Sequence, residues 1–319
     1  MLKYASNCSE VPVLLEKYYL STMYGLEFAL GVVGNLAVVL SYMLWLRQWK
    51  SIHVYLFNLA VSDLVFLCTL PHIIYSYTWN QRETSPYFCL SNRYILHMNL
   101  YSSLLFMVLV SMDRYVLLQN PLRNHFLLRC NTAIGLSTLS WLLVTMQVAP
   151  LAFFIVQDLQ TQNWTHCSDF GSMSGLQTSY YLSYSLILTA TGYIMPLLSL
   201  GFLSHRIARF LKTQEGIFVQ RSVSFHRPLC VVLMSVLMYL LLYSPYHVMR
   251  NVYIGSRLFK DSVSPCTHDI IKSLYILSRP VAFSHSVVNP ALYFFMGDQF
   301  RELLISHIWL PYRTQGTSS

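Results

Sequence analysis

The chain alternates long apolar stretches with short polar loops from one end to the other. A helix crosses the hydrocarbon core of a bilayer with about 20 residues, because each residue adds about 1.5 Å along the helix axis. Seven stretches are long and apolar enough, namely Tyr18–Trp45, Val54–Thr78, Phe88–Leu118, Thr132–Val156, Ser179–Leu203, Leu229–Ile254 and Ile270–Phe295. This pattern predicts an all-α membrane protein whose core is a bundle of seven transmembrane helices.

Composition supports a membrane protein and argues against a soluble one. Hydrophobic residues make up 55% of the 319 residues, charged residues make up 11%, and the mean hydropathy is +0.45. A soluble domain of this length is more polar. No basic segment with a short apolar core opens the chain, so we expect the first span to insert without cleavage of a signal peptide.

Lysine and arginine are distributed unevenly between the two sides of the predicted bundle. An odd number of spans puts the termini on opposite sides, and cytoplasmic loops carry the excess of basic residues. The loops on the C-terminal side carry Arg47, Lys50, Arg123, Arg129, Arg206, Arg209, Lys212, Arg221, Arg227, Arg301 and Arg313, whereas the other side carries Lys3, Lys17, Arg82, Arg257, Lys260 and Lys272. We therefore predict an extracellular N-terminal tail over residues 1–17, a bundle over 18–295 and a cytoplasmic segment over 296–319.

The net charge of +8 follows largely from the same bias. The basic inner loops are either solvated and close to anionic lipid, or they dock a cytosolic partner. We do not expect the chain to bind nucleic acid.

Cysteines and glycosylation sequons indicate that the outer side faces an oxidising compartment. Asn7 and Asn163 each begin an Asn-x-Ser/Thr sequon, and both fall on predicted outer segments. Four of the seven cysteines also fall there, at Cys8, Cys89, Cys167 and Cys266. Four cysteines allow three pairings, and their spacing does not choose among them.

Each predicted span also carries a short motif. The motifs are Gly34-Asn35, Asp63 within LAVSDL, Asp113-Arg114-Tyr115 within SMDRY, Trp141, Pro196, Pro245, and Asn289-Pro290 with Tyr293 within NPALY. Together they resemble those of the rhodopsin-like (class A) G-protein-coupled receptors, from about Tyr18 to Arg301. The resemblance implies a plasma-membrane receptor that binds a ligand outside the cell and a heterotrimeric G protein inside it.

Longer strings narrow this resemblance. LEKYYLS, YLFNLAVSDLVFLCTLP, SNRYILH, PYHVMRNV, SRPVAF and FFMGDQFRELL are similar to the members of the family that respond to succinate, with receptors for 2-oxoglutarate and purine nucleotides as further relatives. These ligands are all anions. The resemblance implies a receptor for a small extracellular dicarboxylate, with succinate as the first choice and 2-oxoglutarate or a nucleotide as the alternative. It also implies coupling to Gi-class G proteins, with Gq as a second class, and regulation by receptor kinases and arrestin.

Helix geometry gives separate support for an anion site. Arg93 lies about 31 Å outward of the Asp-Arg-Tyr motif in the third span. Arg250 lies about 7 Å outward of the sixth-span proline, and Arg279 lies about 15 Å outward of the NPALY motif in the seventh span. All three fall in the outer third of their spans, where an arginine costs at least about 2.5 kcal/mol unless it faces protein or water. His97 follows Arg93 by four residues and shares its helix face. Because the guanidinium fork matches a carboxylate, the group predicts a site for a small dicarboxylate.

Structural alternatives exist for each member of this group. An arginine can extend to the lipid headgroups, Asp169 can neutralise one arginine in an internal salt bridge, and His97 can be an ordinary core histidine. The resemblance adds Tyr24 and Tyr77 as residues that face the ligand, since their hydroxyls can donate to a carboxylate.

On the inner side, the resemblance implies a signalling switch and a sodium site. Asp113 pairs with Arg114 at rest, and Arg114 turns toward the G protein on activation. The remaining members of the switch are Tyr115, Asn289, Pro290 and Tyr293. The implied sodium site consists of Asp63, Ser103 and Asn289, because an isolated buried carboxylate needs a cation or a proton. We expect no other cofactor.

The family also pairs Cys89 with Cys167 and Cys8 with Cys266, so the resemblance implies these two disulfides. Three residues depart from the family pattern. Tyr243 stands where the family has tryptophan, His285 stands where an asparagine completes the sodium site, and Ser204 stands where the fifth span has tyrosine.

Other function classes lack their signatures. The chain has no His-Glu-x-x-His, Gly-x-Ser-x-Gly or phosphate-binding glycine motif, so we do not expect an enzyme. An anion carrier would need an inverted repeat or a polar path across the midplane, and the sequence shows neither. Between Leu274 and Phe295 the seventh span has no lysine for a chromophore, and Leu96 stands where an amine receptor has aspartate.

An amphipathic segment ends the predicted structure. Gly297–Trp309 presents Phe300, Leu303, Leu304 and Trp309 as its apolar residues, which predicts a short eighth helix lying on the inner membrane surface.

Overall fold

The computed structural model describes residues 2–79, 85–120, 125–161, 163, 170–171, 178–218, 226–259 and 262–296. Within these ranges every regular element is helical. In chain order the elements are α1 (Leu2–Leu14), η1 (Leu15–Leu20), α2 (Ser21–Trp45), α3 (Ser51–Leu67), α4 (Leu70–Thr78), α5 (Pro86–Gln119), η2 (Phe126–Leu128), α6 (Cys130–Thr161), α7 (Thr178–Thr189), η3 (Ala190–Ile194), α8 (Met195–Phe218), α9 (His226–Met238), η4 (Tyr239–Tyr243), α10 (Ser244–Leu258), α11 (Pro265–Phe283) and α12 (His285–Met296).

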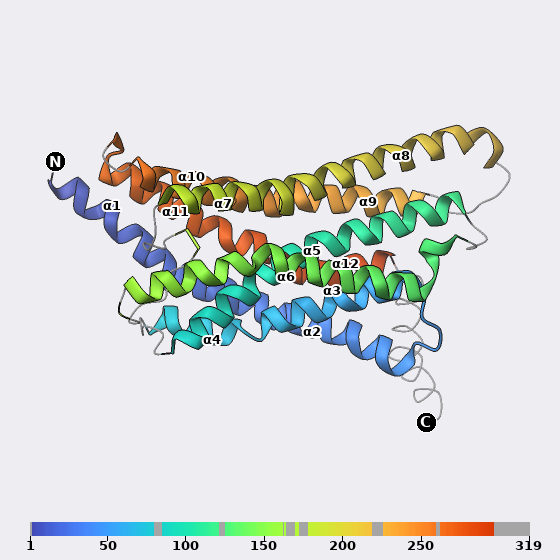
Figure 1. Ribbon diagram of the computed structural model, residues 1–319, viewed down its shortest axis with the longest axis horizontal. Helices are drawn as coiled ribbons and strands as arrows, with labels where there is room; N and C mark the ends of the chain where they lie inside the picture. The colour runs from blue at the N-terminus through green and yellow to red at the C-terminus, as the bar shows by residue number, and fades with distance from the viewer. Residues whose placement is uncertain are drawn as a thin grey trace, which may run out of the picture.

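Consecutive helices join into long rods that run side by side along one axis (Figure 1). The rods are α1–η1–α2, α3–α4, α5, α6, α7–η3–α8, α9–η4–α10 and α11–α12, and each contains one of the seven predicted spans. This confirms the predicted helical bundle. The predicted eighth helix over 297–309 lies outside the described residues.

Six of the rods in the described part of the chain are long and apolar enough to cross a membrane. The exception is α11–α12, which a turn at Ser284 divides and whose outer end begins with the polar sequence PCTHD. The first rod starts at Leu2, so a continuous helical run includes most of the predicted tail over residues 1–17.

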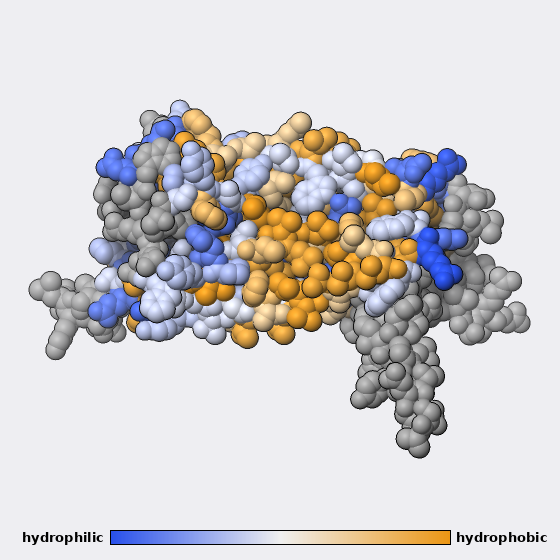
Figure 2. Space-filling view, turned by 90° about the horizontal axis from the view of Figure 1, so that it is seen from below, coloured by the Kyte–Doolittle hydropathy of each residue, from blue (hydrophilic) through white to orange (hydrophobic). Residues whose placement is uncertain are grey.

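Apolar side chains cover the outside of the bundle. Leu30, Val33 and Met43 on α2, Met146 on α6 and Phe202 on α8 are all exposed. Figure 2 shows hydrophobic residues gathered across the middle of one face, with hydrophilic residues at the two ends. An exposed apolar surface of this extent is unfavourable in water, so the bundle is suited to lipid.

Two of the motif prolines lie next to widened helical turns. Pro196 follows the π-helical turn η3, and Pro245 follows the π-helical turn η4. Proline lacks the N–H for the helical hydrogen bond, and its ring displaces the carbonyl group four residues earlier. A widened π turn accommodates that displaced carbonyl, and it therefore changes the direction of side chains on the outer halves of both rods.

Close packing brings the inner halves together. A Cβ atom added at Gly34 of α2 would lie 2.9 Å from the Pro290 side chain of α12, so only glycine permits this approach. Trp141 of α6 donates from Nε1 to Asn58 Oδ1 of α3 at 2.9 Å, and its ring packs edge-on against Phe106 of α5.

A disulfide between Cys8 and Cys266 joins α1 to α11, as predicted. Lys272 and Glu16 form an ion pair between the same two rods at 3.3 Å. Cys89 is also disulfide-bonded, and its predicted partner Cys167 lies outside the described residues. Asn163 is exposed, whereas the side chain of Asn7 lies outside the described set.

Candidate functional site

Three arginines and a histidine meet in the outer half of the bundle. Arg93, His97, Arg250 and Arg279 are at most 7% exposed, and we refer to them as the outer arginine cluster. His97 is within electrostatic reach of all three arginines, so α5, α10 and α11 bring the four residues into one region. Full burial of three cations in one region requires either strong hydrogen bonding or an anionic partner.

Arg250 of α10 has the most completely defined surroundings. Its guanidinium donates from Nη1 to the Tyr101 hydroxyl at 2.8 Å and from Nη2 to Thr189 Oγ1 at 2.9 Å. The rings of Phe170 and Tyr246 lie 4.9 Å and 5.3 Å from its Cζ atom. Its Nε is buried and has no hydrogen-bond partner among the described residues.

The partners of Arg250 are therefore uncharged. Tyr101 and Thr189 orient the guanidinium, and the two rings stabilise its charge through their π faces without neutralising it. The side chain cannot extend to the lipid headgroups, because it is 0% exposed. The arrangement fixes a cation in position and leaves it without a carboxylate partner within the described part of the chain.

Arg279 of α11 lies against tyrosines of two neighbouring rods. It donates from Nη2 to the Tyr77 hydroxyl at 3.1 Å, and the Tyr77 ring lies 5.8 Å from its Cζ atom. Tyr24 of α2 is 0% exposed and within electrostatic reach of Arg279, Tyr77 and Arg93. The Tyr24 hydroxyl has no hydrogen-bond partner among the described residues. Tyr77 thus contacts Arg279, and Tyr24 lies within electrostatic reach of the same arginine.

His97 links α5 to α10 inside the cluster. Its Nδ1 lies 2.8 Å from the Arg93 carbonyl oxygen, and its Nε2 lies 3.3 Å from the Tyr246 hydroxyl. A carbonyl oxygen only accepts, so Nδ1 carries a hydrogen, and Nε2 and the Tyr246 hydroxyl share the second hydrogen bond. The ring also packs against Phe170, at 5.0 Å between centroids. Asp169, the predicted alternative partner of an arginine, lies outside the described residues.

Sequence reasoning missed Glu27 of α2. This glutamate is 3% exposed, and neither carboxyl oxygen has a hydrogen-bond partner among the described residues. It lies within electrostatic reach of Tyr24 and Tyr19. The rule that selected the arginines, an ionisable residue inside an apolar span, would also have selected this glutamate in GLEFALG.

The inner ends of the rods contain the predicted Asp-Arg-Tyr motif. Arg114 donates from Nη2 to Asp113 Oδ2 at 3.0 Å, and Ser51 of α3 donates to the other Asp113 oxygen. Arg206 of α8 donates from Nε to the Tyr115 hydroxyl at 3.2 Å. Asp113 therefore holds Arg114 within α5, and Tyr115 connects the motif to the α7–η3–α8 rod. The side chain of Tyr293 lies outside the described set.

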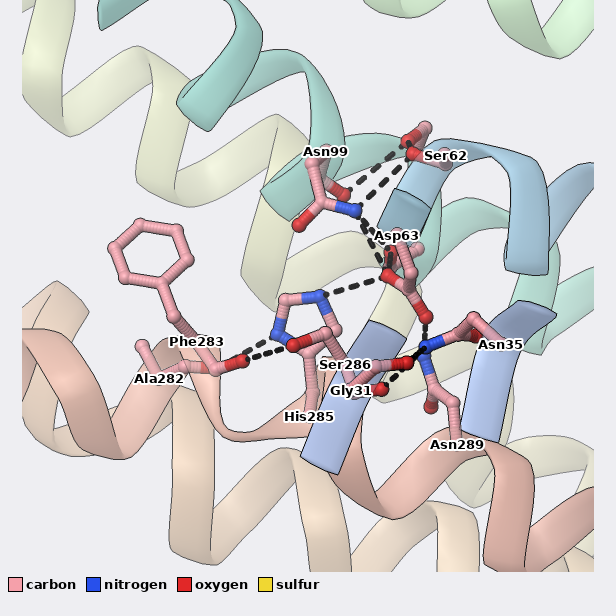
Figure 3. A network of polar contacts seen from close by, with 12 residues as sticks. Gly31, Asn35, Ser62, Asp63, Asn99, Ala282, Phe283, His285, Ser286 and Asn289 are labelled. Carbon is pink, nitrogen blue, oxygen red and sulfur yellow. Dashed lines mark hydrogen bonds and ion pairs between the residues drawn. The ribbon is translucent and has the colours of Figure 1, made fainter. Parts of the chain in front are cut away.

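Midway between these two regions, Asp63 of α3 is 0% exposed and lies at the centre of a polar network (Figure 3). Asn289 donates from Nδ2 to Asp63 Oδ2 at 2.7 Å, and Ser103 donates to Oδ1 at 3.3 Å. The three residues predicted to bind sodium are thus in contact. The sequence did not predict Asn99, which donates from Nδ2 to Oδ1 at 2.8 Å. His285 Nε2 also lies 3.5 Å from Oδ1.

Comparison with known proteins agrees with this architecture. The family model described as 7 transmembrane receptor (rhodopsin family) matches residues 34–293. Succinate receptor 1 of Rattus norvegicus is 44% identical over 297 residues, which is 92% of each chain. Succinate receptor 1 of Mus musculus is 42% identical over 301 residues, 94% of this chain and 93% of the relative. A purinoceptor of Homo sapiens is 29% identical over 301 residues, 93% of this chain and 79% of the relative.

Proposed function

Because this chain belongs to the rhodopsin family of seven-transmembrane receptors, we propose that it is a receptor for a small extracellular dicarboxylate and that succinate is its ligand. It is a membrane receptor and not an enzyme. The names of two relatives with more than 40% identity support the choice of succinate.

The observation that carries the proposal is the outer arginine cluster. Its three cations are buried together, and the described hydrogen-bond acceptors of Arg250 are neutral hydroxyl and carbonyl oxygens. At the low effective dielectric of a protein interior, like charges repel strongly and a small dianion removes that repulsion. A dicarboxylate also offers two flat oxygen pairs, which match two guanidinium forks.

In the proposed arrangement, Arg279 holds one carboxylate with help from the hydroxyls of Tyr77 and Tyr24. Arg93, His97 and Arg250 hold the other carboxylate or guide it into place. Asp169 is a competing partner for one arginine when the ligand is absent. A monocarboxylate reaches only one half of this arrangement and should therefore bind more weakly.

Signalling is proposed to leave from the opposite end of the bundle. The bias of lysine and arginine favours an extracellular N-terminus and a cytoplasmic C-terminus in the plasma membrane. Arg114, paired with Asp113 here, turns toward a heterotrimeric G protein on activation. A Gi-class partner is the first choice and Gq the second. Receptor kinases and arrestin act on the cytoplasmic face.

A nucleotide receptor is the second candidate, because a relative named as a purinoceptor matches 93% of this chain. A nucleotide is also an anion, but it carries a purine ring that needs an aromatic or apolar surface in addition to cations. Ligand selectivity distinguishes the two candidates.

The decisive experiment is a concentration–response panel in cells that express the receptor. The panel contains succinate, maleate, 2-oxoglutarate, ADP and butyrate, with activation of Gi and of Gq measured separately and succinate uptake measured in parallel. The proposal predicts activation by succinate at the lowest concentration, little response to butyrate and no uptake above untransfected cells. Activation by ADP with no response to succinate contradicts the proposal, as does uptake without signalling.

A further inference from the structure

The Asp63 network consists of Asp63, Asn99, Ser103, His285 and Asn289, and it joins three rods at mid-depth. A fourth rod is attached through Asn35 of α2, which donates to the Ser286 carbonyl oxygen at 2.8 Å (Figure 3). The family resemblance implies a sodium ion at this position, so the residues present can be tested for their fit to that ion.

The described donors around Asp63 do not form a sodium site. A small hard cation takes oxygen ligands. Asn99 and Asn289 instead present their amide nitrogens to the carboxylate, at 2.8 Å and 2.7 Å. The oxygens of both amides are buried and have no partner among the described residues. With N–H groups facing Asp63 from two sides, the carboxylate receives hydrogen bonds where a metal ion needs oxygen atoms.

His285 fills a third side of the carboxylate. Its Nε2 lies 3.5 Å from Asp63 Oδ1, and its Nδ1 lies 2.7 Å from the Ala282 carbonyl oxygen. Because the carbonyl only accepts, Nδ1 must donate, which fixes the orientation of the ring. A hydrogen between Nε2 and Oδ1 makes the contact attractive, and the pair is then neutral overall without a metal ion.

A neighbouring aromatic ring holds this imidazole in place. Tyr243 stacks on His285 with ring centroids 5.1 Å apart and an angle of 29° between the planes. Both residues depart from the family pattern, which has tryptophan at position 243 and asparagine at position 285. The smaller ring at 243 leaves room for the larger side chain at 285, so the two departures compensate in volume and are in direct contact.

We infer that His285 completes the Asp63 network in place of a sodium ion, so that this receptor does not bind sodium at Asp63. The inference goes beyond the identity of the extracellular ligand and does not depend on it. Its consequence is that sodium should change neither the stability of the folded protein nor its affinity for agonist.

Thermal unfolding of the purified receptor tests this inference without any agonist. A ligand that binds only the folded state raises the unfolding midpoint with concentration. The midpoint is measured while sodium chloride replaces choline chloride at constant ionic strength, for the wild type, His285→Asn and the double variant His285→Asn with Tyr243→Trp. We expect no shift for the wild type and a saturable upward shift for at least the double variant, which restores both family residues.

Two controls make the outcome decisive. His247→Asn removes another buried histidine of the same bundle, 1% exposed and stacked on Tyr193, and it should gain no sodium response. Asp63→Asn removes the only carboxylate of the network. If sodium stabilises the wild type and Asp63→Asn abolishes that effect, the inference is wrong. If sodium stabilises neither His285→Asn nor its double variant with Tyr243→Trp, His285 does not exclude the ion, and the inference is wrong. Should neither restored variant fold, the wild type measured against Asp63→Asn still decides whether sodium binds.

Discussion

The outer arginine cluster and the Asp63 network both bury charge inside one helical bundle, but they satisfy it in different ways. Asp63 receives N–H and O–H donors from α5 and α12 on both of its oxygens. Arg250 is equally buried, yet it meets only neutral oxygens and aromatic faces and retains an unused Nε donor within the described structure. A buried charge satisfied by the protein holds helices together, whereas a buried charge left with spare donors is suited to a partner that arrives from outside.

The difference predicts which property each region controls. Changes in the outer arginine cluster should alter ligand affinity more than stability, because the described acceptors of Arg250 are neutral and the proposed ligand supplies the anion. Changes in the Asp63 network should alter stability whether or not ligand is present, because its partners belong to the chain.

The largest effect is expected from Arg279→Ala. Removal of one member of a buried charge pair costs about 2–5 kcal/mol, which is roughly 30- to several-thousand-fold in affinity. Succinate affinity should fall by that factor, measured by radioligand binding on cells matched for surface expression. Arg279→Lys should recover only part of the loss, since lysine lacks the fork.

The matched control for Arg279→Ala is Arg257→Ala. Arg257 lies in the last turn of α10 and donates to the Gly171 carbonyl oxygen at 2.9 Å, so it is an outer arginine beyond the cluster. It should change succinate affinity by less than about threefold. Full succinate affinity in Arg279→Ala would leave Arg279 as a structural residue and would break the comparison between the two regions.

Asn99→Ala should produce the reverse behaviour. It removes the 2.8 Å hydrogen bond to Asp63 and leaves a buried charge with one donor fewer, at a cost of about 1–3 kcal/mol. The unfolding midpoint of the purified receptor should fall by a similar amount with and without succinate. Asn120→Ala, directly after the inner end of the same helix, removes only a described bond to the Val116 carbonyl oxygen and should cost less than half as much. A loss of succinate affinity without a fall in the midpoint would contradict a structural role for Asn99.

The sequence predicts the rods and the depth of the charges because both follow from local rules. Runs of about 20 apolar residues gave the seven spans, and a spacing of four placed Arg93 and His97 on one face. The contacts that distinguish the two regions are tertiary and have no local signal. Nothing in the sequence indicates that Thr189 of α7 and Tyr101 of α5 meet Arg250 of α10.

The role of His285 was only half predictable. Its departure from the family pattern was visible in the sequence, but its contact with Tyr243 required knowledge of how two rods pack. Glu27 was fully predictable, since it is an acidic residue in an apolar span.

Tyr101→Phe tests whether hydroxyl groups position the outer cations. The change removes the 2.8 Å bond to Arg250 and keeps the ring, so the expected loss is about 1 kcal/mol, or roughly fivefold in succinate affinity. Tyr94→Phe on the same helix is the control, because its hydroxyl donates to the Thr145 carbonyl oxygen at 3.3 Å near the lipid. Equal affinities for the two variants would mean that Arg250 does not need Tyr101 to meet the ligand.

The smallest effect is expected from Glu27→Gln, and it separates the two regions most finely. Glu27 is buried like Asp63 but receives no hydrogen bond from the described residues, and it lies close to Tyr24. An amide has nearly the same shape as a carboxyl group, so a residue that neither holds a donor nor meets the ligand should tolerate the change. We expect the free energy of unfolding and the free energy of succinate binding each to change by no more than about 0.5 kcal/mol, which is roughly twofold in affinity. Glu27→Leu is measured beside Glu27→Gln, because leucine removes the polar group that glutamine keeps. A loss of affinity in Glu27→Gln well beyond twofold would place Glu27 with the outer arginines as part of the ligand site, whereas a fall in the midpoint alone would place it with Asp63 as a group that the fold requires.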